Sequence, residues 1–476
     1  MTGNIKTLTI ALEEIKITRK FKDFSHFIIE KMGYTYSETI GEEAKEQQKE
    51  IRQQAFAEFR QRTHREEIAS LPTMRKWFGI GGKATPSREQ VYQMCFVMGL
   101  SAVDAEEFLL EGIKEPSFQV NDYSETILMY GLENGFAYEE CVEMIDELEE
   151  RMEPDISFQQ TRGTQMLLSE FKGHKHLSKE KFLDWMEENA ACFKGYSKTT
   201  LDYFIKYKKI ILDYVKKDAE EELSRLLAET DFENWCRSRG FLTKDPKKKI
   251  HNYIRSHSTG KKNILSDDLK ESIMELAAIA YTDKNANAQL LGEVFRSNKT
   301  LKTDTSVGFN AIEGMTGKKL SDLLNVATQK QRIFHVRQAS RKIKELENEE
   351  ACPKWIQEMT QEYSRKKVEI KTVADAKKWM KEYLEEHKRR CLQIQRSDIL
   401  PMILYVSQRR YLEEIDHDMT NYNQQDALIA FDNLANATLS ACNMCQINEQ
   451  YELDTVLRSC YGKEEMYTYS ELLEVI

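Results

Sequence analysis

Helix start and stop signals follow one another at short intervals between residues 70 and 154. In order along the chain they are Thr85–Pro86, Gly99, Ser101 with Asp104, Asn121, Asn134–Gly135 and Pro154. A capping hydroxyl followed by proline starts a helix, a serine three residues before an acid resembles a capping box, and a left-handed glycine ends a helix. Segments bounded this closely are expected to fold as a series of short helices.

The rest of the chain has the composition of a helical protein. Its 476 residues include only 7 prolines and 20 glycines, the two residues that most disfavour a helix interior. Apolar residues recur at helical spacing over 197–227, and a long polar helix with a thin apolar stripe is predicted over 41–69. The only strand candidates are the short segments 6–11 and 367–371. We therefore predict an all-α fold, arranged as a multi-domain helical array.

The clearest linker in the sequence is a segment rich in Ser, Thr, Asn and Gly, residues 297–318. Changes in charge and composition divide the long part that precedes it. The predicted units are an N-terminal helical segment (1–59), a helical domain with an acidic extension (60–155), a middle helical domain (156–296), the linker (297–318) and a C-terminal helical domain (319–476).

Cysteine usage and the N-terminus indicate the compartment. The nine cysteines are scattered singly, so no disulfide framework is implied and a reducing cytoplasm is the expected location. The N-terminal text MTGNIKTLTIALEEIK reaches acidic residues before any long apolar run forms, and no later apolar run approaches membrane length. We therefore expect a cytoplasmic protein with no membrane partner.

Charge is distributed unevenly along the chain. The formal net charge is -10, yet residues 101–155 alone hold 17 acidic residues against Lys114 and Arg151, a net charge of −15. Residues 60–100 are basic, with seven Arg and Lys against three Glu. Such asymmetry informs on partners. The basic part suits a polyanion, whereas the acidic helices 101–155 either bind a protein partner or form ordinary solvated faces.

A resemblance to a known family enters at residues 60–150. The text PTMRKWFG, then TPSREQVYQMCFVMGLS and DAEEFLLEG, resembles the back half of an XRE-family (phage-repressor-like) helix-turn-helix domain. In that family a recognition helix ends near a Trp, a Gly-containing loop follows, and Pro opens a helix that ends in LGLS. The continuation NDYSETILMYGLENGFAYEECVEMI is similar to the extension of a bacterial subset of such domains.

The resemblance implies a helix-turn-helix subdomain and a DNA-binding, regulatory function. It places a basic helix in the major groove, anchored from behind by Trp77 and Phe78, because Arg and Lys on such a helix reach phosphates and base edges. The residues predicted to contact DNA in this part of the chain are Thr73, Arg75, Lys76, Lys83 and Arg88.

Two further basic stretches would add phosphate contacts, which hold DNA without reading its sequence. Residues 240–264 are predicted to be a loop-rich connector, with seven Lys and Arg against Asp245 alone. Residues 328–344 are predicted to be a basic helix, the second of a helix pair. The contacts predicted here are Lys247, Lys248, Lys249, Arg332 and Arg337. The connector is alternatively an ordinary solvated linker, or a mate for the acidic block.

Catalytic and metal-binding patterns are sparse, so we predict no cofactor and favour a non-enzymatic role. Cys442 and Cys445 form a lone CxxC, whereas a structural zinc site has four ligands. HD phosphohydrolases bind metal through His and Asp residues that occur in a fixed order along the chain. A similar order is present here in His387, His417–Asp418 and either Asp426 or Asp454. Three functions therefore stand open: a nucleic-acid-binding regulator, a helical protein-interaction scaffold with a degenerate helix-turn-helix, and a metal-dependent phosphohydrolase.

Overall fold

A computed structural model gives the architecture of the chain. It describes residues 5–18, 23–35, 42–152, 164–193, 198–238, 244–258, 265–281, 358, 361–363, 365–368, 371–387, 394–449 and 451–475. Over these residues the protein is all-α, as predicted, with one isolated antiparallel bridge between Tyr461 and Met466. The strand expected at 6–11 is wrong, because those residues lie in helix α1 (Ile5–Thr18). The linker predicted at 297–318 lies outside the described residues.

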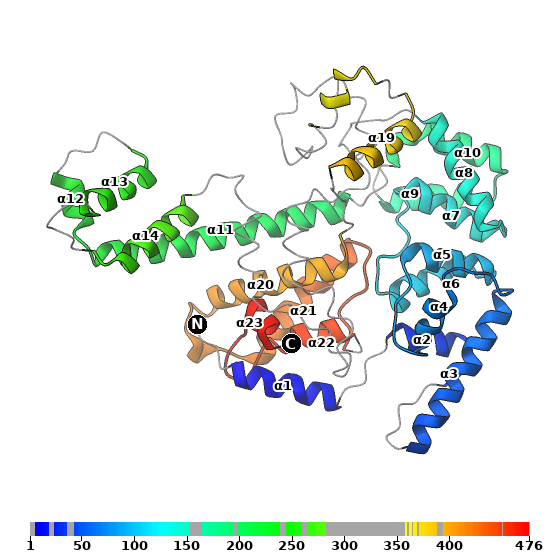
Figure 1. Ribbon diagram of the computed structural model, residues 1–476, viewed down its shortest axis with the longest axis horizontal. Helices are drawn as coiled ribbons and strands as arrows, with labels where there is room; N and C mark the ends of the chain where they lie inside the picture. The colour runs from blue at the N-terminus through cyan, green and yellow to red at the C-terminus, as the bar shows by residue number, and fades with distance from the viewer. Residues whose placement is uncertain are drawn as a thin grey trace.

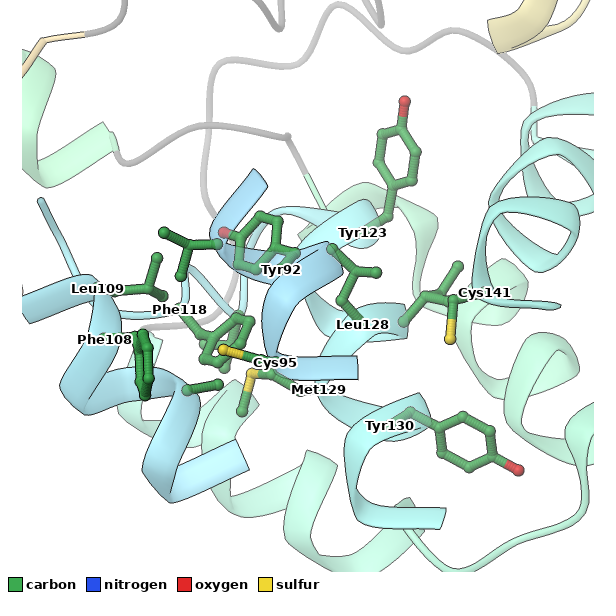
Figure 2. Packing of buried hydrophobic residues seen from close by; sticks show 14 of the residues in the cluster. Tyr92, Cys95, Phe108, Leu109, Phe118, Tyr123, Leu128, Met129, Tyr130 and Cys141 are labelled. Carbon is green, nitrogen blue, oxygen red and sulfur yellow. The ribbon is translucent and has the colours of Figure 1, made fainter. Parts of the chain in front are cut away.

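One hydrophobic core, the first core, joins the helices between residues 24 and 193. They are α2 (Phe24–Lys31), α3 (Glu42–Arg62), α4 (Leu71–Trp77), α5 (Arg88–Val97), α6 (Ala102–Glu107), the π-helical turn η1 (Phe108–Gly112), α7 (Tyr123–Asn134), α8 (Tyr138–Arg151), α9 (Thr164–His174), α10 (Lys179–Glu188) and η2 (Ala190–Cys192). Figure 2 shows part of this core, where the rings of Tyr92 and Phe118 stack with centroids 5.5 Å apart. The predicted boundaries 59/60 and 155/156 fall among helices that share this core.

A helix from much later in the chain completes the first core. α19 (Val373–Glu386) packs on α8, and its buried Val373 donates a backbone hydrogen bond to the Met152 carbonyl (3.0 Å). Lys377 forms an ion pair with the buried carboxylate of Glu149 (2.6 Å). The C-terminal part of the chain is therefore not a separate packing unit.

The predicted cap signals act in the structure, with two shifts. Gly99 (φ 63°) and Gly135 (φ 70°) take the left-handed conformation that ends a helix, as expected. Ser87, not Thr85, caps α5, since only Ser87 has Gln90 three residues later to complete a reciprocal capping box. α7 is capped by Asp122, one residue after the predicted Asn121.

The second core is built from both ends of the chain around a buried helix. Its helices are α1, the first half of α11 (Lys198–Ala228), α20 (Arg396–Glu414), α21 (Gln424–Ala441), α22 (Glu452–Arg458) and α23 (Tyr469–Val475). α20 lies at its centre and is buried on several sides, and α1 packs on α23. The exposed turn η6 (Met419–Asn421) lies between α20 and α21 along the chain. Near the start of α20, Arg396 holds the fully buried Asp454 through two hydrogen bonds of 2.6 Å each.

The second half of α11 extends away from the second core and ends in a small helical tip, which we call the arm tip. α11 has 31 residues, a length of about 46 Å at 1.5 Å per residue. α12 (Phe232–Ser238), α13 (Pro246–Ser258) and α14 (Asp267–Ala280) form the tip, with α14 packed along α11. Figure 1 shows the tip at one end of the longest axis of the molecule.

The two large cores meet at a polar junction. The segment that follows η1 lies against the loop between α21 and α22. Ser117 donates its N–H to the Asn443 carbonyl (3.2 Å), and the Cys445 thiol donates to the Leu110 carbonyl (3.1 Å). Backbone and side-chain hydrogen bonds thus join the cores at this point.

Candidate nucleic-acid interface

α4, the helix that the resemblance places in the DNA groove, has one buried and one exposed side. Met74 and Trp77 are fully buried, and the Trp77 ring meets Phe59 edge-on at 6.4 Å. Arg75 and Lys76 lie on the opposite side, exposed to solvent, and no carboxylate in the described part of the chain pairs with either. Residues three apart share a helix face and neighbours do not. Met74 and Trp77 therefore lie on the buried side of α4, and Arg75 and Lys76 between them lie on the exposed side.

Two apolar residues complete the exposed side of α4. Leu71 is 46% exposed and Pro72 is also exposed. Thr73, the third residue predicted to face the groove, lies half-buried at the edge, with its hydroxyl 2.8 Å from the Ser70 hydroxyl. Ser70 itself precedes the first helical residue. The exposed side therefore offers two cations and two apolar groups.

A glycine loop fixes the end of α4 where the two cations lie. The Ile80 N–H donates to the Arg75 carbonyl (3.0 Å) and the Ala84 N–H to the Lys76 carbonyl (3.2 Å). Gly82, at φ 130°, turns the chain back toward the helix in a conformation that other residues rarely adopt. The backbone beneath both cations is therefore held in place.

The approach to α4 differs from the expected continuous helix. α3 ends at Arg62 rather than continuing to residue 69. The Arg60 guanidinium donates to the carbonyls of Arg65 (2.7 Å) and Glu66 (2.5 Å), which pins the connection 63–70 to α3. This connection is longer than the turn of about three to four residues usual in a helix-turn-helix. The approach to α4 therefore departs from the helix-turn-helix pattern that the resemblance implies.

Arg88 does not belong to the exposed basic surface. Its side chain is buried and holds both carboxylate oxygens of Glu125, at 2.8 and 2.9 Å, while it also donates to the Pro116 and Ser117 carbonyls. Burial would lower the pKa of Arg88, but the Glu125 charge outweighs it and raises that pKa. A guanidinium in this position stabilises the fold and cannot reach a phosphate.

Lys83 is half-exposed and already has a partner. Its ammonium lies 2.6 Å from the Asp23 carboxylate, which also caps α2 by accepting the His26 N–H (3.0 Å). Burial raises the pKa of Asp23, but the hydrogen bond with His26 and the charges of His26 and Lys83 hold it well below its ordinary value. Contact of Lys83 with DNA would compete with this ion pair.

The predicted loop-rich connector 240–264 instead contains α13, a regular helix. Its apolar side carries Ile250 and Tyr253, which are both buried. Lys247 and Lys248 are exposed, whereas Lys249 is half-buried on another side of the helix. Helical periodicity, rather than the run of lysines, therefore decides which of the three can reach a partner.

The basic elements are not gathered on one surface. Figure 1 shows α13 at the arm tip and α4 near the opposite end of the longest axis. Arg332 and Arg337, predicted on a third basic element, lie outside the described residues. The surface that the structure assembles around α4 consists of Arg75 and Lys76, with Lys83 nearby but paired.

The acidic residues of 101–155 divide into buried and exposed groups. Glu125 and Glu149 are buried in ion pairs with Arg88 and Lys377. An exposed stripe runs along α8, the α8 stripe, formed by Glu139, Glu143, Asp146 and Glu150. Its four- and three-residue spacing keeps the carboxylates on one face, and they form no ion pair among the described residues. Figure 1 places α5 and α6 between α8 and α4.

The residues that suggested a phosphohydrolase do not form a metal-binding group in the described part of the chain. His417 is exposed in a left-handed turn (φ 58°), and Asp418 caps η6 through the Thr420 N–H (3.0 Å). Asp454 is held by Arg396. Within the described ranges no group of three or more His, Cys, Asp and Glu side chains is placed to hold a metal ion. The structure therefore does not assemble this metal site.

The cysteines of the CxxC have separate surroundings. Cys442 is buried at the end of α21, where burial raises the pKa of its thiol to about 11. Cys445 lies at the junction, where its thiol donates to the Leu110 carbonyl and accepts a contact from the Tyr451 hydroxyl (3.7 Å). Both act as parts of the packed structure.

Comparisons of the chain with protein-family models, curated proteins and solved structures gave no match. In the part of the chain that the structure describes, no helix combines the length and apolar character needed to cross a membrane. Sequence reasoning missed three interactions of the described residues. They are the ion pair of Asp23 with Lys83, the hydrogen bond from the Arg52 guanidinium to the Gly79 carbonyl, and the ion pair of Lys377 with Glu149. They join residues far apart in sequence, and no local pattern marks them.

Proposed function

We propose that the protein binds nucleic acid, as a regulator of the helix-turn-helix kind, through the exposed side of α4. The observation that supports this proposal most is the placement of Arg75 and Lys76. Both are exposed and without an ion pair in the described ranges, directly opposite the buried Trp77. Cations held on a firmly anchored helix meet phosphates and base edges with little loss of conformational freedom.

Salt-dependent DNA binding tests this function. Each phosphate contact contributes about −0.9 to the slope of log K against log salt concentration. Arg75→Ala with Lys76→Ala should therefore weaken binding and reduce the magnitude of the slope by about 2. Lys181→Ala with Lys217→Ala removes two exposed cations from α10 and α11 and serves as the charge-matched control.

Two results would reject the proposal. Absence of binding by the wild-type protein at low salt removes the function itself. Equal loss of affinity in the α4 variant and the control would show that general charge, rather than α4, attracts the DNA.

A second candidate function, a protein-interaction scaffold, is favoured by the α8 stripe. Four exposed carboxylates spaced along one helix face, without ion pairs in the described ranges, repel one another and destabilise the helix by a few tenths of a kcal/mol per pair, on the order of 0.2–0.5. A basic partner would relieve that repulsion. We infer a lysine- or arginine-rich protein segment as the partner in this case.

Titration with an oligolysine peptide tests the second candidate. Glu143→Gln with Asp146→Asn should weaken binding to the peptide, whereas Glu414→Gln with Glu464→Gln, two exposed acids in the second-core part of the chain, should not. Identical affinities of both variants would count against a specific role of the α8 stripe.

A further inference from the structure

The arm tip carries a basic surface of its own. Lys247, Lys248, His251 and Arg255 are exposed on α13, and we call this set the α13 face. Lys248 retains 73% exposure of its side chain while its ammonium is 3.8 Å from Asp245. Spacings of three and four residues from Lys248 to Arg255 keep these groups on one side of the helix.

The opposite side of α13 is fixed against the rest of the tip, so the α13 face points away from it. The Tyr253 ring packs against Phe232 and Trp235, with centroids 5.1 and 5.2 Å away. The Tyr253 hydroxyl donates to Asp231 (2.5 Å), and Ile250 is buried in the cluster with α14. Burial in this cluster makes α13 a rigid support for its outer cations.

The chemistry of the α13 face suits a regular polyanion. Lys247, Lys248 and Arg255 provide three permanent positive charges over eight residue steps, about 12 Å along the helix. A nucleic-acid strand places one phosphate about every 3.4 Å of the duplex axis, so several phosphates fall within reach. Lysine and arginine on such a face neutralise phosphates without reading bases.

The position of the α13 face decides what it can do. It lies at the arm tip, and α4 lies near the opposite end of the longest axis (Figure 1). The 31-residue α11 carries the tip away from the second core. A duplex much shorter than the persistence length of about 150 base pairs is stiff. A short duplex bound at the arm tip therefore does not curve round to contact α4 as well.

We propose that the α13 face is a second, sequence-independent phosphate-binding site, and that the protein bridges two separate segments of duplex nucleic acid. This inference rests on the proposed function, because α4 supplies the other contact. The two cation sets would then act on different duplexes.

A bridging assay with full-length protein tests the inference. One duplex of about 12 base pairs, about 41 Å long at 3.4 Å per pair, is immobilised on beads, and a second, fluorescent copy is free. Wild-type protein should retain the fluorescent duplex on the beads and bind two duplexes per chain in a stoichiometric titration.

Lys247→Ala with Lys248→Ala should abolish bridging and reduce the stoichiometry to one duplex per chain, since α4 is untouched. The charge-matched Lys181→Ala, Lys217→Ala variant should bridge like wild type. Raising salt from 50 to 200 mM should weaken binding at the α13 face by about 12-fold, the loss expected for the two phosphate contacts of Lys247 and Lys248.

The outcomes separate this inference from the proposed function. Wild-type protein that binds one duplex without bridging overturns the second site and leaves the function of α4 intact. Bridging that survives in the Lys247→Ala, Lys248→Ala variant also overturns it, because two α4 surfaces in a dimer would then be responsible. Wild-type protein that binds no duplex at low salt rejects the function and the bridging together.

Discussion

At the scale of single residues, burial rather than charge decides what each cation does. Arg75 and Arg88 are both arginines of the basic segment 60–100, yet one is exposed on α4 and the other is enclosed by Glu125 and two carbonyls. A buried, fully hydrogen-bonded guanidinium is costly to leave without its partner, and so is the carboxylate that it neutralises. Arg88 is therefore a structural residue, and Arg75 is available for binding.

Arg88→Ala should be among the most damaging substitutions in the first core. It leaves the buried Glu125 carboxylate without its counter-charge, at a cost of about 3–5 kcal/mol in the free energy of unfolding. Urea denaturation measures that free energy. Arg75→Ala is the control and should change it by less than about 0.5 kcal/mol, so equal effects of the two substitutions would contradict the assignment.

Asp23 predicts a pH dependence. Its pKa in the folded protein lies well below the ordinary 3.8, so between these two values the unfolded chain binds more protons than the folded one. The stabilisation is therefore present above about pH 4 and is lost as the pH falls. Asp23→Asn should flatten the decline of unfolding free energy below about pH 4, down to about pH 2. Asp146→Asn, on the exposed α8 stripe, should retain the wild-type profile; a steep decline in Asp23→Asn would contradict this role.

At the scale of helices, local caps set the lengths and close packing sets the distances between axes. α7 and α8 approach each other at Gly131, where an added Cβ would lie 2.1 Å from the Cys141 sulfur and 3.1 Å from the Phe96 ring. No side chain fits there without displacing α8. The glycine is therefore required for packing, although glycine weakens a helix interior.

Gly131→Ala should destabilise the first core by about 1–3 kcal/mol through overpacking. Gly173→Ala on α9 is the matched control: an added methyl meets open space there, so the better helix propensity of alanine should stabilise by about 0.5–1 kcal/mol. Thermal unfolding compares the two. Addition of Cys141→Ala to Gly131→Ala should restore part of the loss by removing the sulfur, and no restoration would point to another clash.

At the scale of the whole molecule, chain topology joins distant segments into two cores and an arm. α1 packs on α23, and α19 packs on α8. The junction between the cores depends on the loop after α21, which Arg396 holds through the carbonyls of Cys445 and Gln446 as well as through Asp454. Arg396 therefore links the interior of the second core to its contact with the first.

Arg396→Met should loosen the junction and the second core together. It leaves Asp454, which is fully buried, without its partner, a loss of about 3–5 kcal/mol. Amide exchange of Ser117, whose N–H donates to Asn443 across the junction, should accelerate. Arg458→Met breaks the more exposed pair with Asp432 and should leave Ser117 protected; the same acceleration in both variants would contradict a specific role of Arg396.

The sequence by itself determined the helical fold class and much of the local detail of the candidate interface. The left-handed glycines, the Ser101 capping box and the burial of Trp77 and Phe78 all appear as expected. The caps and glycine turns depend on residues within a few positions of each other, where propensity and capping act. The burial of Trp77 and Phe78 also needs Phe59 from α3. The helix predicted over 197–227 from its apolar periodicity corresponds to α11 (Lys198–Ala228), and this periodicity is also a local property of the sequence.

Only the tertiary structure decided which basic residues share a surface. Arg88 meets Glu125 from 37 positions away and Lys377 meets Glu149 from 228, and no local pattern selects such partners. The same holds for the separation of α4 from α13, which follows from the course of α11 (Figure 1). A charge count along the chain adds cations together, whereas burial, pairing and distance determine which of them one ligand can meet.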